Sequence, residues 1–466
     1  MSTELNSSAR QLGFWMCVAL VIGNIIGSGI FLLPASLAPY GLNSVWAWLL
    51  TSAGALGLAL VFAGLSRGLP TAGGPYDYTR LAFGALPGFL VMWCYWISTW
   101  VGIAAIATAL VSYLSNLLPW IASTHAASIL LTIGFIWLLT VVNVLGTRSA
   151  GKVQVVTAAL KLIPLLAIVA LGIYLALRGS PLLETTHLTS THFDLGAVTA
   201  AATLTLFALC GMESAAVASG KVRDPARTIP RATLVGTVIA AVIYIIASTT
   251  IMLLVPGDRL AQSNAPFADV AAMFWGAGVA HWFAGFAAIS CFGALNGWIL
   301  VNGQLGFQLG RSGLFPKSFA RETAARTPAI SLFVSSALAS VLVLMNFGKS
   351  IVAVFTFLVL LSTTAVLFMY LLCSLAALKL LRNGTIPASK GNMGLAIGGA
   401  IGAAFSLWAL AGAGISTDPH TCGASLICWT PWHTNPVYLG FLLLSVGLPI
   451  FYAMRTRNLV TPPMLP

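Results

Sequence analysis

Long apolar segments follow one another along almost the whole chain, and short polar stretches separate them. A helix needs about 20 apolar residues to cross a bilayer, and segments of that length recur twelve times. The pattern predicts an all-α integral membrane protein with twelve transmembrane helices. The predicted spans are residues 12–36, 45–69, 88–118, 127–146, 153–177, 195–219, 231–255, 277–308, 328–346, 351–381, 394–414 and 435–454.

The composition supports this reading of the pattern. Hydrophobic residues make up 59% of the 466 residues and charged residues only 7%, and the mean hydropathy is +0.96. A soluble domain carries about 25% charged residues. The composition therefore excludes an ordinary soluble protein.

The basic residues lie mostly on one side of the predicted helix layout. The net charge of +12 would by itself suit a nucleic-acid partner, but of the 22 Lys and Arg residues all except Lys161, Arg178, Arg259 and Lys349 fall on the same side. By the positive-inside rule this side faces the cytoplasm. We expect a multi-pass protein of the inner (plasma) membrane with both termini cytoplasmic, lipid around it and no nucleic-acid partner. The first span is long and lacks a small-residue cleavage site, so we expect it to serve as the insertion signal.

Residues 23–29 read GNIIGSG and interrupt the first apolar span. Glycine costs a helix about 1 kcal/mol relative to alanine. Irregular backbone survives at membrane depth only where protein or a water-filled cavity surrounds its unpaired groups. The sequence therefore predicts a helix that is broken at a ligand site.

The sixth span contains a second interruption, CGMES, with Gly211 and the intramembrane carboxylate Glu213. Transporters built from inverted repeats break corresponding helices of their two halves. The second break comes five helices after the first, and because five is odd the halves would start from opposite sides of the bilayer. The simpler alternative is two unrelated glycine-containing helices. The predicted organisation is a cytoplasmic tail (1–11), a first repeat of helices 1–5 (12–178), a second repeat of helices 6–10 (195–381), helices 11 and 12 (394–454) and a second cytoplasmic tail (455–466).

Five motifs, in this order and spacing, carry a resemblance to a known family. They are GNIIGSGIFLLPASLA, PTAGGPYDYTRLAFG, YWISTWVG, CGMESAAVASGKVRDPARTIPRAT and LNGWILVNGQLGFQLGRSGLFP. The chain resembles the amino acid-polyamine-organocation superfamily, and within it the basic amino acid/polyamine antiporters, a group that includes arginine/agmatine antiporters. The resemblance implies a twelve-helix LeuT-like bundle, a 5+5 inverted repeat with helices 1 and 6 broken, and a homodimer.

The broken first helix is expected to hold the two charged groups of an amino acid. The N–H groups of Gly27, Ser28 and Gly29 begin a half-helix whose positive end suits a carboxylate. The resemblance implies that carbonyls near Ile25, and across the gap near Phe207 and Cys210, accept from the ammonium.

Trp298 falls where the resembling antiporters stack a tryptophan on the substrate cation, a contact worth about 0.5–2 kcal/mol. Phe207 takes the place of a gating tryptophan, and Tyr95 that of a pocket tyrosine. A tryptophan or tyrosine in a membrane protein otherwise belongs to the core or to the interface.

Two positions depart from the resembling antiporters. Ile103 replaces an asparagine that contacts the distal cation, and Leu360 replaces a serine, while Ser98 and Thr99 remain as polar groups. Because a buried charge without partners is costly, a neutral amino acid competes with arginine as substrate. The predicted substrate-binding residues are Asn24, Ile25, Gly27, Ser28, Gly29, Tyr95, Ser98, Thr99, Ile103, Phe207, Cys210, Trp298 and Leu360.

Four residues are candidates for coupling or gating. Lys161 lies inside the fifth span, where its amine could occupy the place of a sodium ion and bind carbonyls of the broken helix, with Asn296 as a candidate partner; the alternative is a lysine that snorkels to the interface. Glu213 suits a proton-linked role or a structural acceptor at the second break. Tyr76 matches a tyrosine linked with pH sensing, and is otherwise an interface anchor.

The remaining polar residues indicate no enzyme and no cofactor. The histidines match no metal-site spacing, and no phosphate-binding loop is present. Five cysteines lie in apolar helices, whereas Cys422 and Cys428 share a loop outside the cytoplasm, where a disulfide is allowed. We therefore expect a secondary active transporter of an amino acid or amine, most simply an antiporter of the arginine/agmatine type, with protons as a candidate coupling ion. The alternative is a proton-coupled permease or exporter of neutral amino acids.

Overall fold

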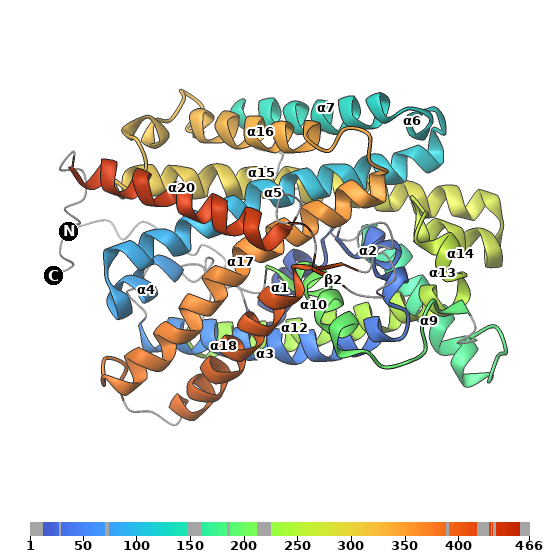
Figure 1. The fold of residues 1–466 in the computed structure, drawn as a ribbon, viewed down its shortest axis with the longest axis horizontal. Coiled ribbons are helices and arrows are strands. Elements are labelled where there is room, and N and C mark those ends of the chain that lie inside the picture. The colour runs from blue at the N-terminus through green and yellow to red at the C-terminus, as the bar shows by residue number, and fades with distance from the viewer. Residues whose placement is uncertain are drawn as a thin grey trace, which may run out of the picture.

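The structure is a computed structural model that describes residues 13–27, 29–69, 74–146, 160–183, 187–211, 225–387, 391–416, 428–429, 431 and 435–456. Almost every described element is a helix (Figure 1). In chain order the helices are α1 (Phe14–Ile25), α2 (Gly29–Leu37), η1 (Ala38–Tyr40), α3 (Asn43–Gly68), α4 (Pro75–Phe83), α5 (Ala85–Leu117), α6 (Trp120–Ser123), α7 (His125–Val144), α9 (Leu162–Leu177), α10 (Leu195–Leu209), α12 (Pro225–Leu254), α13 (Gly257–Leu260), α14 (Pro266–Trp275), α15 (Ala277–Arg311), η4 (Lys317–Ala320), α16 (Ala329–Leu344), α17 (Ile351–Arg382), α18 (Asn392–Gly412) and α20 (Pro436–Thr456).

Eight of the described helices are long and apolar enough to cross a membrane. The eight are α3, α5, α7, α12, α15, α17, α18 and α20. Shorter apolar helices include α1, α2, α9, α10 and α16. The chain is thus an all-α protein whose described helices suit a membrane, as the apolar pattern predicted.

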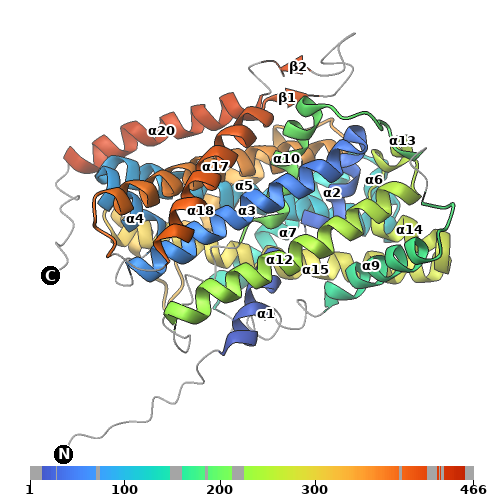
Figure 2. The same cartoon turned by 90° about the horizontal axis from the view of Figure 1, so that it is seen from below.

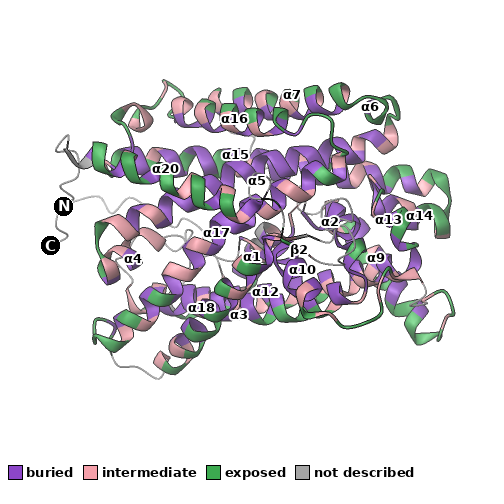
Figure 3. Cartoon of the chain, viewed as in Figure 1, coloured by how far each residue is buried: buried purple, intermediate pink, exposed green. Residues whose placement is uncertain are grey.

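The longest helices cross at the centre of the bundle. Of an 18-residue apolar stretch in α5, 94% is buried, whereas the corresponding share in α20 is 22%. Helix α5 packs against both α15 and α17. Figure 3 shows buried residues along α5 and α17 and exposed residues at the rim, and Figure 2 shows α20 at one edge and α9 at another. Large apolar side chains remain exposed on the outer helices, for example Leu138, Leu407 and Leu442, as a lipid-facing surface requires.

Local backbone signals set several helix ends. The Asp194 carboxylate accepts from the N–H groups of Gly196 (2.7 Å) and Ala197 (3.1 Å) and so caps the N-terminus of α10. Gly84, with φ +97°, makes the turn between α4 and α5, a conformation that favours glycine.

The structure corrects several details of the sequence prediction. The stretch between the second and third spans is helical over α4, and the short helices α6, α13 and α14 were not predicted. A two-residue ladder pairs β1 (Ile415–Ser416) with β2 (Cys428–Trp429) in antiparallel register. Its Cys428 is disulfide-bonded, and Cys422 lies outside the described residues. The other five cysteines, Cys17, Cys94, Cys210, Cys291 and Cys373, are in no disulfide.

Candidate functional site

The first apolar span is interrupted at the predicted place. Helix α1 ends at Ile25 and α2 begins at Gly29, and Ile26 and Gly27 between them are not helical. The Gly27 N–H donates to the Ile25 carbonyl at 2.7 Å, which closes a tight turn. Ser28 and the side chain of Asn24 lie outside the described residues.

Helix α10 also ends inside the bundle. It stops at Leu209, after which Cys210 is extended and Gly211 has φ +106°, a conformation that favours glycine. Residues 212–224, which include Glu213, lie outside the described residues. The Cys210 thiol donates to the Leu206 carbonyl at 3.3 Å.

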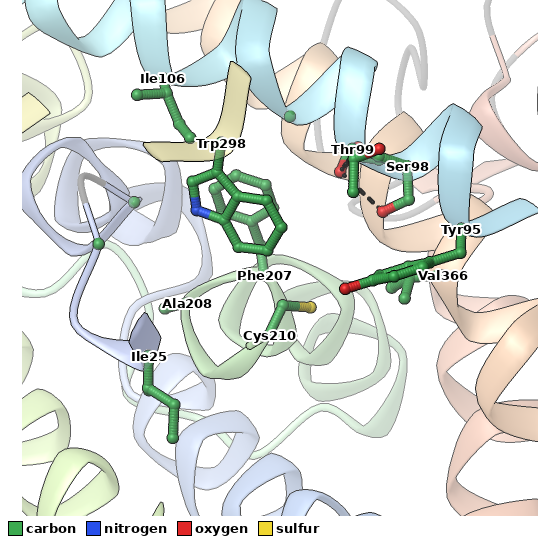
Figure 4. Close-up of a pocket in the computed structure, with 14 residues that line it drawn as sticks. Ile25, Tyr95, Ser98, Thr99, Ile106, Phe207, Ala208, Cys210, Trp298 and Val366 are labelled. Atoms are coloured by element: carbon green, nitrogen blue, oxygen red, sulfur yellow. Dashed lines mark hydrogen bonds between the residues drawn. The ribbon is translucent and has the colours of Figure 1, made fainter. Parts of the chain in front are cut away.

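One cavity lies where these helix ends meet α5, α15 and α17 (Figure 4). Its wall comes partly from backbone and partly from side chains that approach from opposite sides. Nine predicted substrate-binding residues line it together. The lining residues are Ile25, Gly27, Gly29, Tyr95, Ser98, Thr99, Gly102, Ile106, Phe207, Ala208, Cys210, Trp298, Ser362 and Val366.

Ile103 and Leu360 do not line this cavity, and a role for them in substrate binding stays a prediction. Ile103 is buried next to the lining face of α5, where Gly102 is the lining residue. On α17 the lining residue is Ser362, two positions after Leu360. Two positions turn a helix by about 200°, so Leu360 points away from the face that Ser362 occupies.

The cavity is small. Its volume of about 50 Å³ is far below the ~300–1,000 Å³ typical of small-molecule sites. Phe207 lies directly against the first residue of α2, since a Cβ on Gly29 would be 2.9 Å from its Cδ1 atom. Phe207 also packs edge-to-face on Phe355, with ring centroids 6.4 Å apart. A ligand the size of an amino acid therefore requires side chains such as Phe207 to move.

Carbonyl groups at the C-terminal end of α1 are held from neighbouring helices. The last carbonyls of any helix lack partners within it. Buried Lys161, at the start of α9, donates from Nζ to the Gly23 carbonyl, and a lysine also suits the negative end of the helix dipole. Tyr244, a fully buried residue of α12, donates from its hydroxyl to the Ile25 carbonyl at 2.9 Å. We call Ile25, Gly27 and Gly29 the backbone wall.

Asn296 has a different partner from the one predicted. Its Oδ1 accepts from Nδ2 of Asn143 on α7 at 2.9 Å, and Asn143 also donates to the Leu139 carbonyl at 2.8 Å. The described hydrogen bond of Lys161 goes to Gly23 instead. Asn296 therefore ties α15 to α7.

Three hydroxyl side chains form the opposite side of the cavity, which we call the hydroxyl wall: Ser98 and Thr99 of α5 and Ser362 of α17. Ser362 donates to the Ser98 carbonyl at 2.8 Å, and the two serine Oγ atoms lie 3.3 Å apart. Figure 4 shows Ser98 and Thr99 together, with the Tyr95 hydroxyl directed toward the middle of the cavity. Among the described residues, no carboxylate, amine or guanidinium lines the cavity.

Tyr76 lies away from the cavity. It belongs to α4, is half-buried, and has the Arg80 guanidinium carbon 5.9 Å from its ring centroid. It does not line the cavity. A role for Tyr76 in gating stays a prediction.

Tyr244 and Ser362 are site residues that sequence reasoning missed. Tyr244 is the single tyrosine of an otherwise apolar stretch, IAAVIYIIAS, and such an isolated phenol needs a partner when buried. Ser362 lies within a polar run, STT, where the sequence alone does not say which hydroxyl faces inward.

Comparisons with known proteins agree on one family. The family model for amino acid permeases matches residues 12–432. A cadaverine/lysine antiporter of Escherichia coli K12 is 36% identical over 67% of this chain and 70% of its own length. A putative arginine/ornithine antiporter of Bacillus subtilis is 33% identical over 82% of this chain and 87% of its own length. The putrescine transporter PotE of Escherichia coli K12 is 31% identical over 91% of this chain and 96% of its own length.

Proposed function

Because the chain belongs to the amino acid permease family of the amino acid-polyamine-organocation superfamily, we propose that it exchanges an amino acid for an amine by alternating access. The named relatives handle lysine and cadaverine, arginine and ornithine, and putrescine. Each name includes a basic amino acid or a diamine. Arginine with agmatine is a third pair of the same chemistry.

The cavity between the backbone wall and the hydroxyl wall is the proposed substrate site, and it is the observation that carries the proposal. The substrate carboxylate would lie at the start of α2, where N–H groups and the helix dipole favour an anion. The ammonium would bind carbonyls at the end of α1 and near Cys210. The side chain would extend past Trp298 toward the hydroxyl wall.

The proposed architecture is a 5+5 inverted repeat with two added helices. The eight long apolar helices, together with α9, α10, α16 and the α1–α2 pair counted as one, would make twelve membrane crossings. The cavity lies at the break in the first of these and at the C-terminal end of α10, the sixth. The repeats would span residues 12–178 and 195–381, with residues 394–454 outside them.

Lys161 is the proposed coupling residue. Its amine donates to the Gly23 carbonyl at the end of α1. A change in its protonation would therefore change this hydrogen bond, which holds the end of α1 beside the break between α1 and α2. Glu213, outside the described residues, is a second candidate. Both tails would be cytoplasmic in the inner membrane, and two copies would associate as a homodimer.

A proton-coupled permease or exporter of neutral amino acids is the second candidate. The observation that favours it is the cavity lining, in which no described residue is charged. The two functions differ in what drives uptake.

Counterflow into liposomes tests the proposal. Purified protein is reconstituted with unlabelled lysine or cadaverine inside, and uptake of labelled lysine is measured with and without a proton gradient. We expect uptake that depends on internal substrate. Uptake that needs only the proton gradient, or that prefers leucine to lysine, would instead support the permease.

A further inference from the structure

Asn302 lies behind the hydroxyl wall, on α15, one helical turn after Trp298. It is buried, and its Nδ2 donates to Thr99 Oγ1 at 2.5 Å and to the Trp96 carbonyl at 3.4 Å. Its own Oδ1 is buried without a hydrogen-bond partner among the described residues. An unpaired buried oxygen is unfavourable, and the described hydrogen bonds of this side chain are made by its amide N–H groups. What Asn302 contributes is its N–H donors.

The Thr99 hydroxyl is fixed by two contacts. A hydroxyl has one hydrogen and two lone pairs. The Thr99 hydrogen goes to the Trp96 carbonyl at 2.8 Å, and the Asn302 amide fills one lone pair. Because an N–H approaches the oxygen from α15, the hydroxyl hydrogen cannot point in that direction. Thr99 therefore presents only a lone pair to the cavity.

The two serines of the wall have the same polarity. Ser362 uses its single hydrogen on the Ser98 carbonyl at 2.8 Å. In the contact of 3.3 Å between the two Oγ atoms, Ser98 is then the donor. All three hydroxyl hydrogens of the wall are used within the protein, and the wall faces the cavity with acceptors alone.

We propose that Asn302 is a positioning residue that keeps the Thr99 hydroxyl an acceptor toward the cavity, and that the acceptor-only hydroxyl wall selects substrates whose side chain ends in a hydrogen-bond donor. The inference rests on the proposed function, since it assigns the substrate class of the same cavity. The terminal ammonium of a basic amino acid or diamine fits such a wall, with the ring of Trp298 as a further contact for the cation. A methyl end would leave the acceptors without partners.

The test compares lysine with 2-aminoheptanoate, which has a methyl group in place of the terminal ammonium. Their affinities for the purified full-length protein are measured by calorimetry. The wild type should prefer lysine by about tenfold or more, as expected for one hydrogen bond to a charged group. Asn302→Ala and Thr99→Val should each lower this preference by a few-fold, because the acceptors of Ser98 and Ser362 remain. The double variant should lose no more than Thr99→Val alone, because Asn302 acts through Thr99.

Thr140→Val is the matched control. Thr140 is a buried threonine of α7 that donates to the Ile136 carbonyl and contacts Ser336 Oγ at 2.6 Å, away from the cavity. Its replacement should leave the preference unchanged. If Asn302→Ala does not fold, Asn302→Leu keeps the volume, removes the N–H donors and should lower the preference in the same way.

Three outcomes would overturn the inference. Equal wild-type affinity for the two probes would contradict the acceptor-only wall. An unchanged preference in Asn302→Ala, or additive losses in the double variant, would contradict the role of Asn302. In these last two cases exchange in the counterflow assay would still stand, so the proposed function and this inference fail separately.

Discussion

The backbone wall and the hydroxyl wall face each other across one cavity but are held in different ways. The groups of the hydroxyl wall bond to one another, to their own helix and to Asn302 directly behind them. The carbonyls at the end of α1 are held by Lys161 and Tyr244, which reach in from α9 and α12. We infer that the hydroxyl wall is the rigid side that reads the substrate, and that the backbone wall is the side that rearranges.

Among the variants considered, replacing Lys161 should have the largest effect, because this residue holds the backbone wall. Lys161→Met leaves the Gly23 carbonyl without its described donor, and a hydrogen bond to a charged group is worth about 1.5–3 kcal/mol. We expect exchange in liposomes to slow by about tenfold to a hundredfold and to lose its dependence on pH. Lys349→Met is the control, since Lys349 bonds to Asn346 outside the cavity. A Lys161→Met protein with the wild-type rate and pH profile would show that the backbone wall does not depend on this amine.

Tyr244→Phe should have a smaller effect than Lys161→Met, and it should strengthen substrate binding. The Ile25 carbonyl accepts from both Gly27 N–H and Tyr244, so both of its lone pairs are occupied. A substrate ammonium must then displace the phenol, and removing that hydroxyl should tighten lysine binding by about fivefold, which corresponds to one neutral hydrogen bond.

The matched control for Tyr244 is Tyr113→Phe. Tyr113 is equally buried and donates to the Phe31 carbonyl of α2 at 2.7 Å, but Phe31, unlike Ile25, does not line the cavity. Both variants should lower Tm, and only Tyr244→Phe should tighten binding. Weaker binding in Tyr244→Phe would mean that the substrate does not compete for the Ile25 carbonyl.

Gly29→Ala should have the smallest effect. The added Cβ would lie 2.9 Å from Cδ1 of the Phe207 ring. Overpacking a rigid core costs about 1–3 kcal/mol, and we expect a lower cost here because the Phe207 side chain can move aside. We expect a few-fold rise in KM without loss of folding. Gly134→Ala on α7, where nothing lies within 4 Å of the new Cβ, should leave KM unchanged. Equal KM in both variants would argue against Phe207 as a lid on the backbone wall.

The same contrast explains what the sequence could predict. Glycines in an apolar span announce a broken helix, so GNIIGSG located the backbone wall, and the apolar pattern located the long helices. The hydroxyl wall depends on which face of α5 and α17 turns inward. That rotation is set by packing against several helices. The resemblance pointed to Ile103 and Leu360, whereas Gly102 and Ser362 line the cavity.

Pairings between distant helices were also beyond the sequence. Lys161 was predicted to reach the broken helix, and it does, but its expected partner Asn296 bonds to Asn143 instead. Tyr244 and Asn302 act from helices whose apolar pattern gives no sign of the cavity. Their role follows only from the carbonyl or hydroxyl that each one contacts.

An experimental structure of the full-length protein with bound lysine tests most directly the claim that the two walls hold opposite ends of one substrate. We predict the carboxylate at the start of α2 and the terminal ammonium within hydrogen-bond distance of Ser98, Thr99 or Ser362, with Phe207 displaced from Gly29. Lysine bound in the reverse orientation, or outside this cavity, would contradict the claim.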